Sequence, residues 1–140
     1  FYLSFNSLNN FNYSKIPYFY YIENIDLSNN NLTIIPDDFL VYYFSLKFLN
    51  LSKNRLIFLY DNLFHKLIFL NSLDLSSNLL IKCSENLFKN VQVLVELDLS
   101  DNKIVDLSYQ NFLYLIHLEY LNISKNLLKQ IPKKIFSQLY

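Results

Sequence analysis

The sequence predicts a solenoid of six stacked coils that share one parallel β-sheet. The first observation is an asparagine that recurs every 24 residues without slippage, and the second is a serine two residues before each of these asparagines. The third is a set of apolar residues that keeps the same phase around every asparagine. A fixed period of this length is typical of repeat proteins, in which each repeat buries its core only against its neighbours. The asparagines are Asn6, Asn30, Asn54, Asn78, Asn102 and Asn126.

Each repeat is expected to contribute one short strand ahead of its asparagine. Leu73 and Leu75 alternate with polar residues, as in a strand that has one buried face. The leucines are expected to point inward, whereas Ser72, Asp74 and Ser76, with their equivalents in the other repeats, point outward. One strand cannot enclose a core, but strands stacked about 4.8 Å apart form a continuous sheet over it.

The remainder of each repeat is expected to return as an arc on the other side of the core. An aromatic and a final apolar residue recur in the arc, for example Phe88 with Val91 and Phe112 with Leu115. Two repeats depart from this pattern, because one has Leu40, and the truncated opening repeat Ile16, where the others have phenylalanine. The predicted repeats of this single domain span residues 1–21, 22–45, 46–69, 70–93, 94–117 and 118–140.

The recurrent asparagine is expected at the bend where the chain leaves the strand. Its amide group both donates and accepts hydrogen bonds. It can therefore satisfy backbone groups, in its own turn and in the neighbouring turn, that would otherwise be buried without partners. All six asparagines are predicted to have this structural role.

The repeated pattern resembles a known family. L-x-x-L-x-L-x-x-N-x-L, followed by an inner leucine or isoleucine and then by phenylalanine and leucine, is similar to the typical 24-residue class of leucine-rich repeat. Pro36 and Pro132 stand where that class often has proline. The resemblance covers nearly the whole chain, which is similar in particular to repeats of Toll-like receptors, small leucine-rich proteoglycans and other cell-surface proteins. It implies an α/β-type solenoid, a horseshoe with the parallel sheet on its concave side and irregular or short-helical arcs on its convex side.

The resemblance also implies that the chain is a segment of a longer protein. Complete extracellular domains of this kind carry cysteine-rich caps at both ends, whereas this chain has one cysteine and no methionine. Uncapped ends expose core positions, so we expect the isolated segment to be prone to aggregation.

Composition disfavours several classes of function. Twelve Lys and Arg balance twelve Asp and Glu without any basic run, so the sequence predicts no nucleic-acid partner. No apolar run approaches the roughly 18 residues that a bilayer-spanning helix requires, so no membrane insertion by this segment is expected. Because the chain has no glycine, it has no glycine-rich phosphate loop, and no zinc-ligand spacing occurs. No cofactor is predicted.

Few residues suggest catalysis. Cys83 has no partner for an internal disulfide, and it occupies a core position that holds a larger apolar residue in other repeats, so we interpret it as a small hydrophobe. Asp74 and Asp98 hold equivalent positions on adjacent strands, about 5 Å apart, and such a pair could share a proton or flank a glycosidic bond. An open sheet offers no enclosed pocket, however, and Asp26 repeats the position. A solvated acidic stripe is the preferred interpretation, and no enzyme is predicted.

The candidate binding surface consists of outward strand positions, where the residue changes from repeat to repeat. Phe48 and Tyr120 are large aromatic residues at expected exposed positions, where binding hot spots tend to arise. The acidic residues between them suit a partner with a basic patch. The alternative is that an aromatic-rich composition places such residues at exposed sites by chance. The predicted partner-binding residues are Phe48, Asn50, Asp74, Glu96, Asp98 and Tyr120.

Four Asn-x-Ser/Thr sequons are candidate glycosylation sites, at Asn12, Asn31, Asn50 and Asn122. Their number is little more than this asparagine-rich composition gives by chance. Sugar on Asn50 and Asn122 would crowd the concave face and move a partner to a flank.

The resemblance implies a function in recognition. The chain is expected to be part of the extracellular domain of a cell-surface receptor or adhesion protein, with a protein or another macromolecule as its ligand. An intracellular, cytoplasmic scaffold or regulatory subunit is the alternative, and a substrate-docking arm of an enzyme is the third interpretation. A signal peptide, cysteine caps or a transmembrane helix in flanking sequence would separate the first two.

Overall fold

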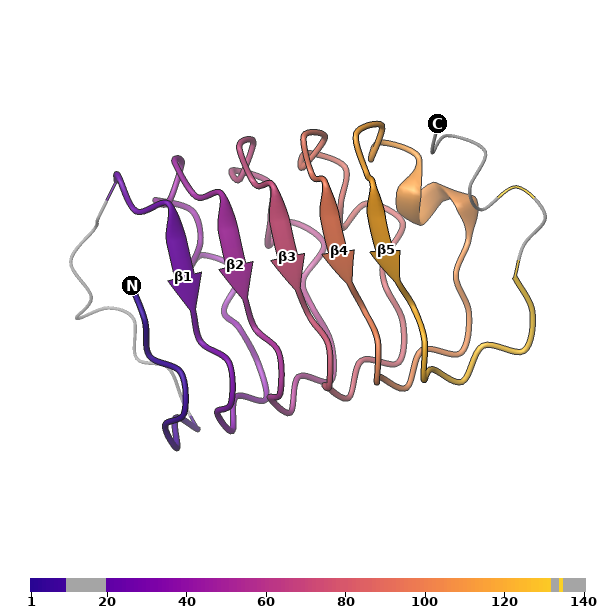
Figure 1. The fold of residues 1–140 in the computed structure, drawn as a ribbon, viewed down its shortest axis with the longest axis horizontal. Coiled ribbons are helices and arrows are strands. Elements are labelled where there is room, and N and C mark those ends of the chain that lie inside the picture. Colours follow the sequence, from indigo (N-terminus) through magenta and orange to yellow (C-terminus); the bar gives the residue numbers. More distant parts are fainter. Residues whose placement is uncertain (10–19, 132–133, 135–140) are drawn as a thin grey trace.

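The computed structural model describes residues 1–9, 20–131 and 134. Five short strands form one parallel sheet, and their order in space is their order in the chain. Each strand is followed by a bend and by an arc that returns behind the sheet (Figure 1). The strands are β1 (Asn24–Asp26), β2 (Phe48–Asn50), β3 (Ser72–Asp74), β4 (Glu96–Asp98) and β5 (Tyr120–Asn122). An isolated bridge between Tyr2 and Asp26 adds the first coil. The predicted solenoid is confirmed.

Every strand pair is aligned by the period of the sequence. Leu73 of β3 lies opposite Leu97 of β4, 24 residues further on. The backbone ladder continues past the strands, since the N–H of Lys53 donates to the carbonyl oxygen of Ser76 (2.9 Å). Because all coils keep this register, each outward position forms a straight row across the sheet.

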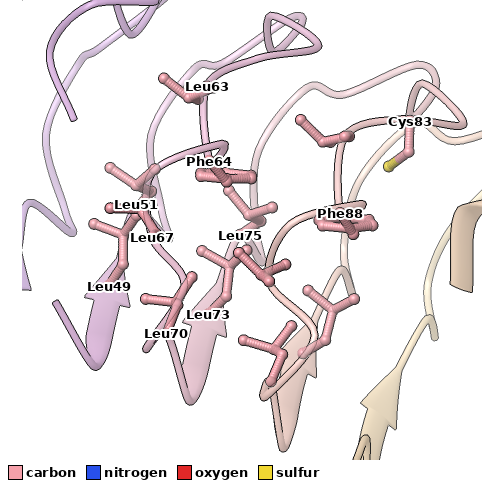
Figure 2. Packing of buried hydrophobic residues seen from close by; sticks show 14 of the residues in the cluster. Leu49, Leu51, Leu63, Phe64, Leu67, Leu70, Leu73, Leu75, Cys83 and Phe88 are labelled. Atoms are coloured by element: carbon pink, nitrogen blue, oxygen red, sulfur yellow. The ribbon is translucent and has the colours of Figure 1, made fainter. Parts of the chain in front are cut away.

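The core consists of inward side chains stacked in rows from coil to coil. Phe64 and Phe88 hold the same position in successive arcs, and their rings stack with centroids 6.3 Å apart and planes 5° apart (Figure 2). Leu73 and Leu75 enter the core from the sheet side, and all four side chains are at most 1% exposed. Each buried side chain of this size stabilises the fold by about 1.5–3 kcal/mol. Since every coil lacks a core of its own, the stacking of coils holds the fold together.

The arcs are largely irregular. The helix found in the described part of the chain is one 3-10 turn, Tyr109–Phe112 (η2). Its buried Asn111 donates to the carbonyl oxygens of Cys83 (3.0 Å) and Ser84 (3.1 Å) in the preceding coil. The Oδ1 of Asn111 accepts the N–H of Ser108 at 2.7 Å. These bonds leave the buried amide satisfied, in a position that other coils fill with leucine or phenylalanine.

The recurrent asparagine links each coil to the one before it. The Nδ2 of Asn54 donates to the carbonyl oxygens of Leu27 in the preceding coil (2.9 Å) and Leu51 in its own coil (3.1 Å). Its Oδ1 accepts the N–H of Leu32 at 3.1 Å. The side chain therefore supplies the hydrogen bonds that backbone groups of two coils would otherwise make to water. The same arrangement recurs at Asn30, Asn78, Asn102 and Asn126.

Asn6 differs from this series. It is exposed, and its Nδ2 donates to the carbonyl oxygens of Leu3 (2.9 Å) and Ser4 (3.2 Å) of its own turn. No described coil precedes it in the structure, so the bonds seen at Asn6 lie within its own turn. The bridge between two coils is seen at five of the six predicted asparagines.

One residue in each bend has a left-handed backbone. Lys53, for example, has φ of 53°, a conformation that costs about 1–2 kcal/mol in a residue other than glycine. The ladder bond that its N–H donates to Ser76 offsets part of this cost. The equivalent residues are Phe5, Asn29, Lys53, Ser77, Asp101 and Lys125, with φ between 53° and 56°. The bend turns the chain sharply from the face of the sheet towards the core.

The predicted outward orientation of the serine row is wrong in two coils. Ser28 and Ser52 are only 4% and 5% exposed. The Oγ of Ser52 donates to the Oδ1 of Asn50 at 2.7 Å, and the small side chain is covered within the bend. Near the last strand the core is open. Ile131, the equivalent of the buried Leu107, is 58% exposed, because no described coil covers it.

Candidate interaction surface

The outward strand residues form two parallel rows on the face of the sheet, which we call the concave face. Phe48, Glu96 and Tyr120 belong to the row at the first position of each strand and are exposed. Asn50 and Asp98 belong to the row at the third position and are half-buried. Strand alternation places both rows on the same face, and the first row is the more exposed of the two.

Two shallow hollows lie next to each other on the concave face. The first, of about 350 Å³, brings together Asp74, Glu96, Asp98 and Tyr120 over Ser72 and Leu73. The second, of about 310 Å³, contains Phe48 and Asn50 together with residues of β1. Ser72 and Asp74 line both hollows. The six predicted residues therefore lie on one continuous surface that contains two adjoining hollows.

The third-position side chains also shape the bends. One Oδ1 of Asp74 accepts the N–H of Ser76 (2.9 Å), and Asp98 does the same for Ser100 (2.8 Å). Asn50 accepts the N–H of Ser52 through its own Oδ1 at 2.9 Å. Aspartate and asparagine are thus interchangeable for this bond, and they differ in the charge that they place on the surface.

The concave face is acidic although the chain as a whole is neutral. The strand positions carry Asp26, Asp74, Glu96 and Asp98, and β1 to β5 contain no Lys or Arg. Glu96 accepts the hydroxyl of Ser72 (2.9 Å), and Asp98 accepts the Nδ2 of Asn122 (3.0 Å). Neutral donors therefore hold these carboxylates in place without cancelling their charge. The ion pair found within the described ranges, Lys47 with Glu23 at 2.6 Å, lies beside the strands.

The cysteine and the metal-ligating residue types are examples of groups that could carry chemistry. Burial raises the pKa of the Cys83 thiol to about 12, which keeps it protonated and poorly nucleophilic at neutral pH. Within the part of the chain that the structure describes, no group of three or more His, Cys, Asp and Glu is arranged to hold a metal ion. In the same part of the chain, no helix has both the length and the apolar character needed to span a membrane.

The sequons fall on two faces of the solenoid. Asn50 and Asn122 lie on the concave face, and Asn31 follows the bend of its coil; all three are half-buried. Asn12 lies outside the described residues.

Reasoning from the sequence missed a second exposed set of residues, which lies in the turn before each strand. Ile68 and Phe69 are 52% and 56% exposed between the buried Leu67 and Leu70. The run of four apolar residues is itself the signal that could have found them. Its two ends are fixed in the core, so its two middle residues must face solvent.

Comparison with known proteins agrees with this architecture. The leucine rich repeat family model matches residues 44–104 and 92–140, and a second leucine rich repeat model matches residues 21–41. No curated protein matches the chain.

Solved structures similar to this chain include two receptors. A complex of TLR13 with ssRNA13 has a TM-score of 0.79 and 26% identity over 89% of this chain and 18% of that chain. The Drosophila Toll–Spatzle complex has a TM-score of 0.76 and 34% identity over 84% of this chain and 16% of that chain. Its glycosylated form has a TM-score of 0.75 with the same identity. This chain thus spans less than a fifth of the length of these neighbours. It belongs to the leucine-rich repeat family.

Proposed function

We propose that this chain is a recognition segment of a cell-surface receptor or adhesion protein, and that it binds a protein or another macromolecule through its concave face. One observation carries the proposal. The inward strand residues are Ile or Leu in every coil, whereas the first outward position changes from Asn to Phe, Ser, Glu and Tyr across the five strands. The scaffold is constant and the face that it presents is varied, as a binding surface requires. The structural likeness to Toll and TLR13 supports the receptor assignment.

The partner that we propose is a protein with a basic patch. Asp74, Glu96 and Asp98 gather in one hollow, which Tyr120 borders with an aromatic ring that is 51% exposed. Phe48, 46% exposed, offers a second apolar contact in the adjacent hollow. The acidic centre would steer a cationic partner towards the face, and the aromatic rings would add contact area.

The same charges bear on nucleic acid as a partner. TLR13 is a neighbour of this fold in complex with single-stranded RNA, so the fold alone excludes no such ligand. The proposal against nucleic acid rests on charge, because phosphates are bound by Lys and Arg and the strands of this chain carry only acidic charges.

The test uses the double variant Asp74→Asn with Asp98→Asn. Asn50 shows that asparagine makes the same bond to the bend, so the variant removes two charges and keeps the backbone. The probe is a ten-residue peptide rich in Lys and Arg with one Tyr, mixed by stopped flow at several salt concentrations. We expect an association rate roughly ten-fold lower at low salt, with a difference that fades as salt rises.

The matched control is Asp61→Asn with Asp106→Asn, which removes two exposed carboxylates away from the concave face. It should leave the association rate close to that of the wild type. Equal rates for the concave and control variants would contradict the proposal. So would tighter binding of a single-stranded RNA oligonucleotide than of the basic peptide.

A further inference from the structure

A tight turn precedes each strand and presents two residues to solvent. In the turn before β3, the N–H of Leu70 donates to the carbonyl oxygen of Leu67 at 3.0 Å. The equivalent bonds join Leu46 to Tyr43 (3.0 Å), Leu94 to Val91 (3.1 Å) and Leu118 to Leu115 (3.1 Å). The bonded residues of these turns are buried. The two residues between them therefore form a tip that cannot fold back into the core.

Each of these tips carries at least one apolar residue where turn chemistry favours Gly, Asn, Asp or Ser. Their exposed fractions range from 39% for one valine to 90% for one tyrosine. The tips line up along the edge of the sheet where the strands begin, at the top of Figure 1. We call this row the turn ridge, and it consists of Tyr21, Phe44, Ile68, Phe69, Val93 and Ile116.

The turn ridge is large enough to act as an interface. The exposed parts of its six side chains amount to on the order of 600 Å², at the upper end of about 300–600 Å² for the largest apolar patch on a monomer. A stable interface buries about 800 Å² on each partner. The polar tip residues Ser45, Gln92 and His117 lie between the apolar ones. Their surface would supply much of the area by which the apolar side chains fall short of a stable interface.

The charge pattern distinguishes this flank from the opposite one. The tips at 44–45, 68–69, 92–93 and 116–117 contain no Lys, Arg, Asp or Glu. On the flank that follows the strands, exposed apolar residues also recur, at Ile57, Ile81 and Val105, but the charged Arg55 and Lys103 lie in the same region. An uncharged apolar row is matched best by another uncharged apolar row.

We propose that the turn ridge joins two copies of this chain into a symmetric dimer. A two-fold axis through the central tip, 68–69, sets the two ridges antiparallel, so that this tip meets its own copy and 44–45 meets 92–93. Such a contact uses the same patch on both copies and closes at two. This contact leaves both concave faces open. The proposed dimer is therefore independent of what the concave face binds.

The surroundings of the ridge favour a second copy over a membrane surface. Lys47, Lys66 and Lys89 border it, but so do Glu23 and Glu119, so the flank has little net charge to attract anionic lipid. None of the sequons at the described residues lies in a tip. Sugar on the concave face would therefore leave this contact free.

Sedimentation equilibrium of the 140-residue chain and two variants tests the dimer. Ile68→Glu places a charge at the centre of the ridge, and Ile81→Glu makes the same change at an equally exposed site on the opposite flank (52% and 50%). All three proteins share the open ends of the solenoid, so any end-to-end association is common to them. Beyond it, we expect a dimer for the wild type and for Ile81→Glu, and at least a ten-fold weaker dimer for Ile68→Glu. Circular dichroism checks that both variants fold.

Three outcomes would overturn the dimer. The first is a wild-type monomer at high concentration. The second is an open series of oligomers that Ile68→Glu leaves unchanged, which is the behaviour of coils that stack end to end. The third is a monomer that binds vesicles of phosphatidylcholine and phosphatidylserine through Ile68.

A second variant tests the register of the two copies without removing an apolar residue. With Ser45→Cys and Gln92→Cys together, mild oxidation should give a covalent dimer, whereas either change alone should give none. Equivalent cysteines of the two copies would lie about two coil spacings, roughly 10 Å, apart, too far for a disulfide. The native Cys83 is buried and would not compete. No cross-link in the double variant would contradict the antiparallel arrangement.

Discussion

Replacing Asn78 with alanine should lower the free energy of unfolding by roughly 3 kcal/mol or more. The Nδ2 of Asn78 donates to the carbonyl oxygens of Leu51 (3.0 Å) and Leu75 (3.1 Å), and its Oδ1 accepts the N–H of Leu56 (3.0 Å). Each buried group left without a partner costs about 1–3 kcal/mol, and alanine leaves several. Urea unfolding followed by circular dichroism measures the loss.

Asn6→Ala is the matched control, since Asn6 is exposed and bonds within its own turn. Water can replace those bonds, so we expect a loss below about 1 kcal/mol. If both variants lost the same stability, the asparagine would not be the link between coils.

The second large effect is expected from Phe88→Ala. The ring of Phe88 is 1% exposed and stacks on Phe64 across two coils, so its removal opens a cavity that neither coil can close. Substitutions of this kind cost about 3–5 kcal/mol. In a solenoid, that loss weakens the interface between two neighbouring coils.

Phe58→Ala provides the comparison, because Phe58 is 43% exposed and contacts Tyr60 edge-on with centroids 5.1 Å apart. We expect it to lose about 1 kcal/mol or less. Thermal unfolding of the two variants at equal concentration separates them. A similar fall in Tm for both would mean that the phenylalanine row does not hold the coils together.

The fold could be predicted almost completely from the sequence, because each strand requires an inward apolar residue and this requirement recurs every 24 residues. Leu73 and Leu97 must both point inward, and equal coil lengths then place them opposite each other. The bends were less predictable. Ser52 is buried and its hydroxyl bonds to Asn50, and a pattern of polar and apolar residues carries no information about such local packing.

The candidate site could be predicted in part. Alternation along a strand was enough to predict that Phe48, Glu96 and Tyr120 are exposed. It could not predict that Asp74 and Asp98 accept backbone bonds from the bends, because that depends on the path of the chain after the strand. The turn ridge was missed for a similar reason, since its turns, apart from Ser45, contain none of the residue types that usually mark a turn.

Amide hydrogen exchange of Leu32, Leu56 and Leu80 tests the linked-coil account most directly. Their N–H groups donate to Asn54, Asn78 and Asn102 of the following coil, at 3.1, 3.0 and 3.0 Å. If these bonds join the coils, the three amides should exchange only when the solenoid unfolds, with protection equal to the global stability. Exchange of these amides at the rate of an unstructured peptide, under conditions where the chain is folded, would contradict the account.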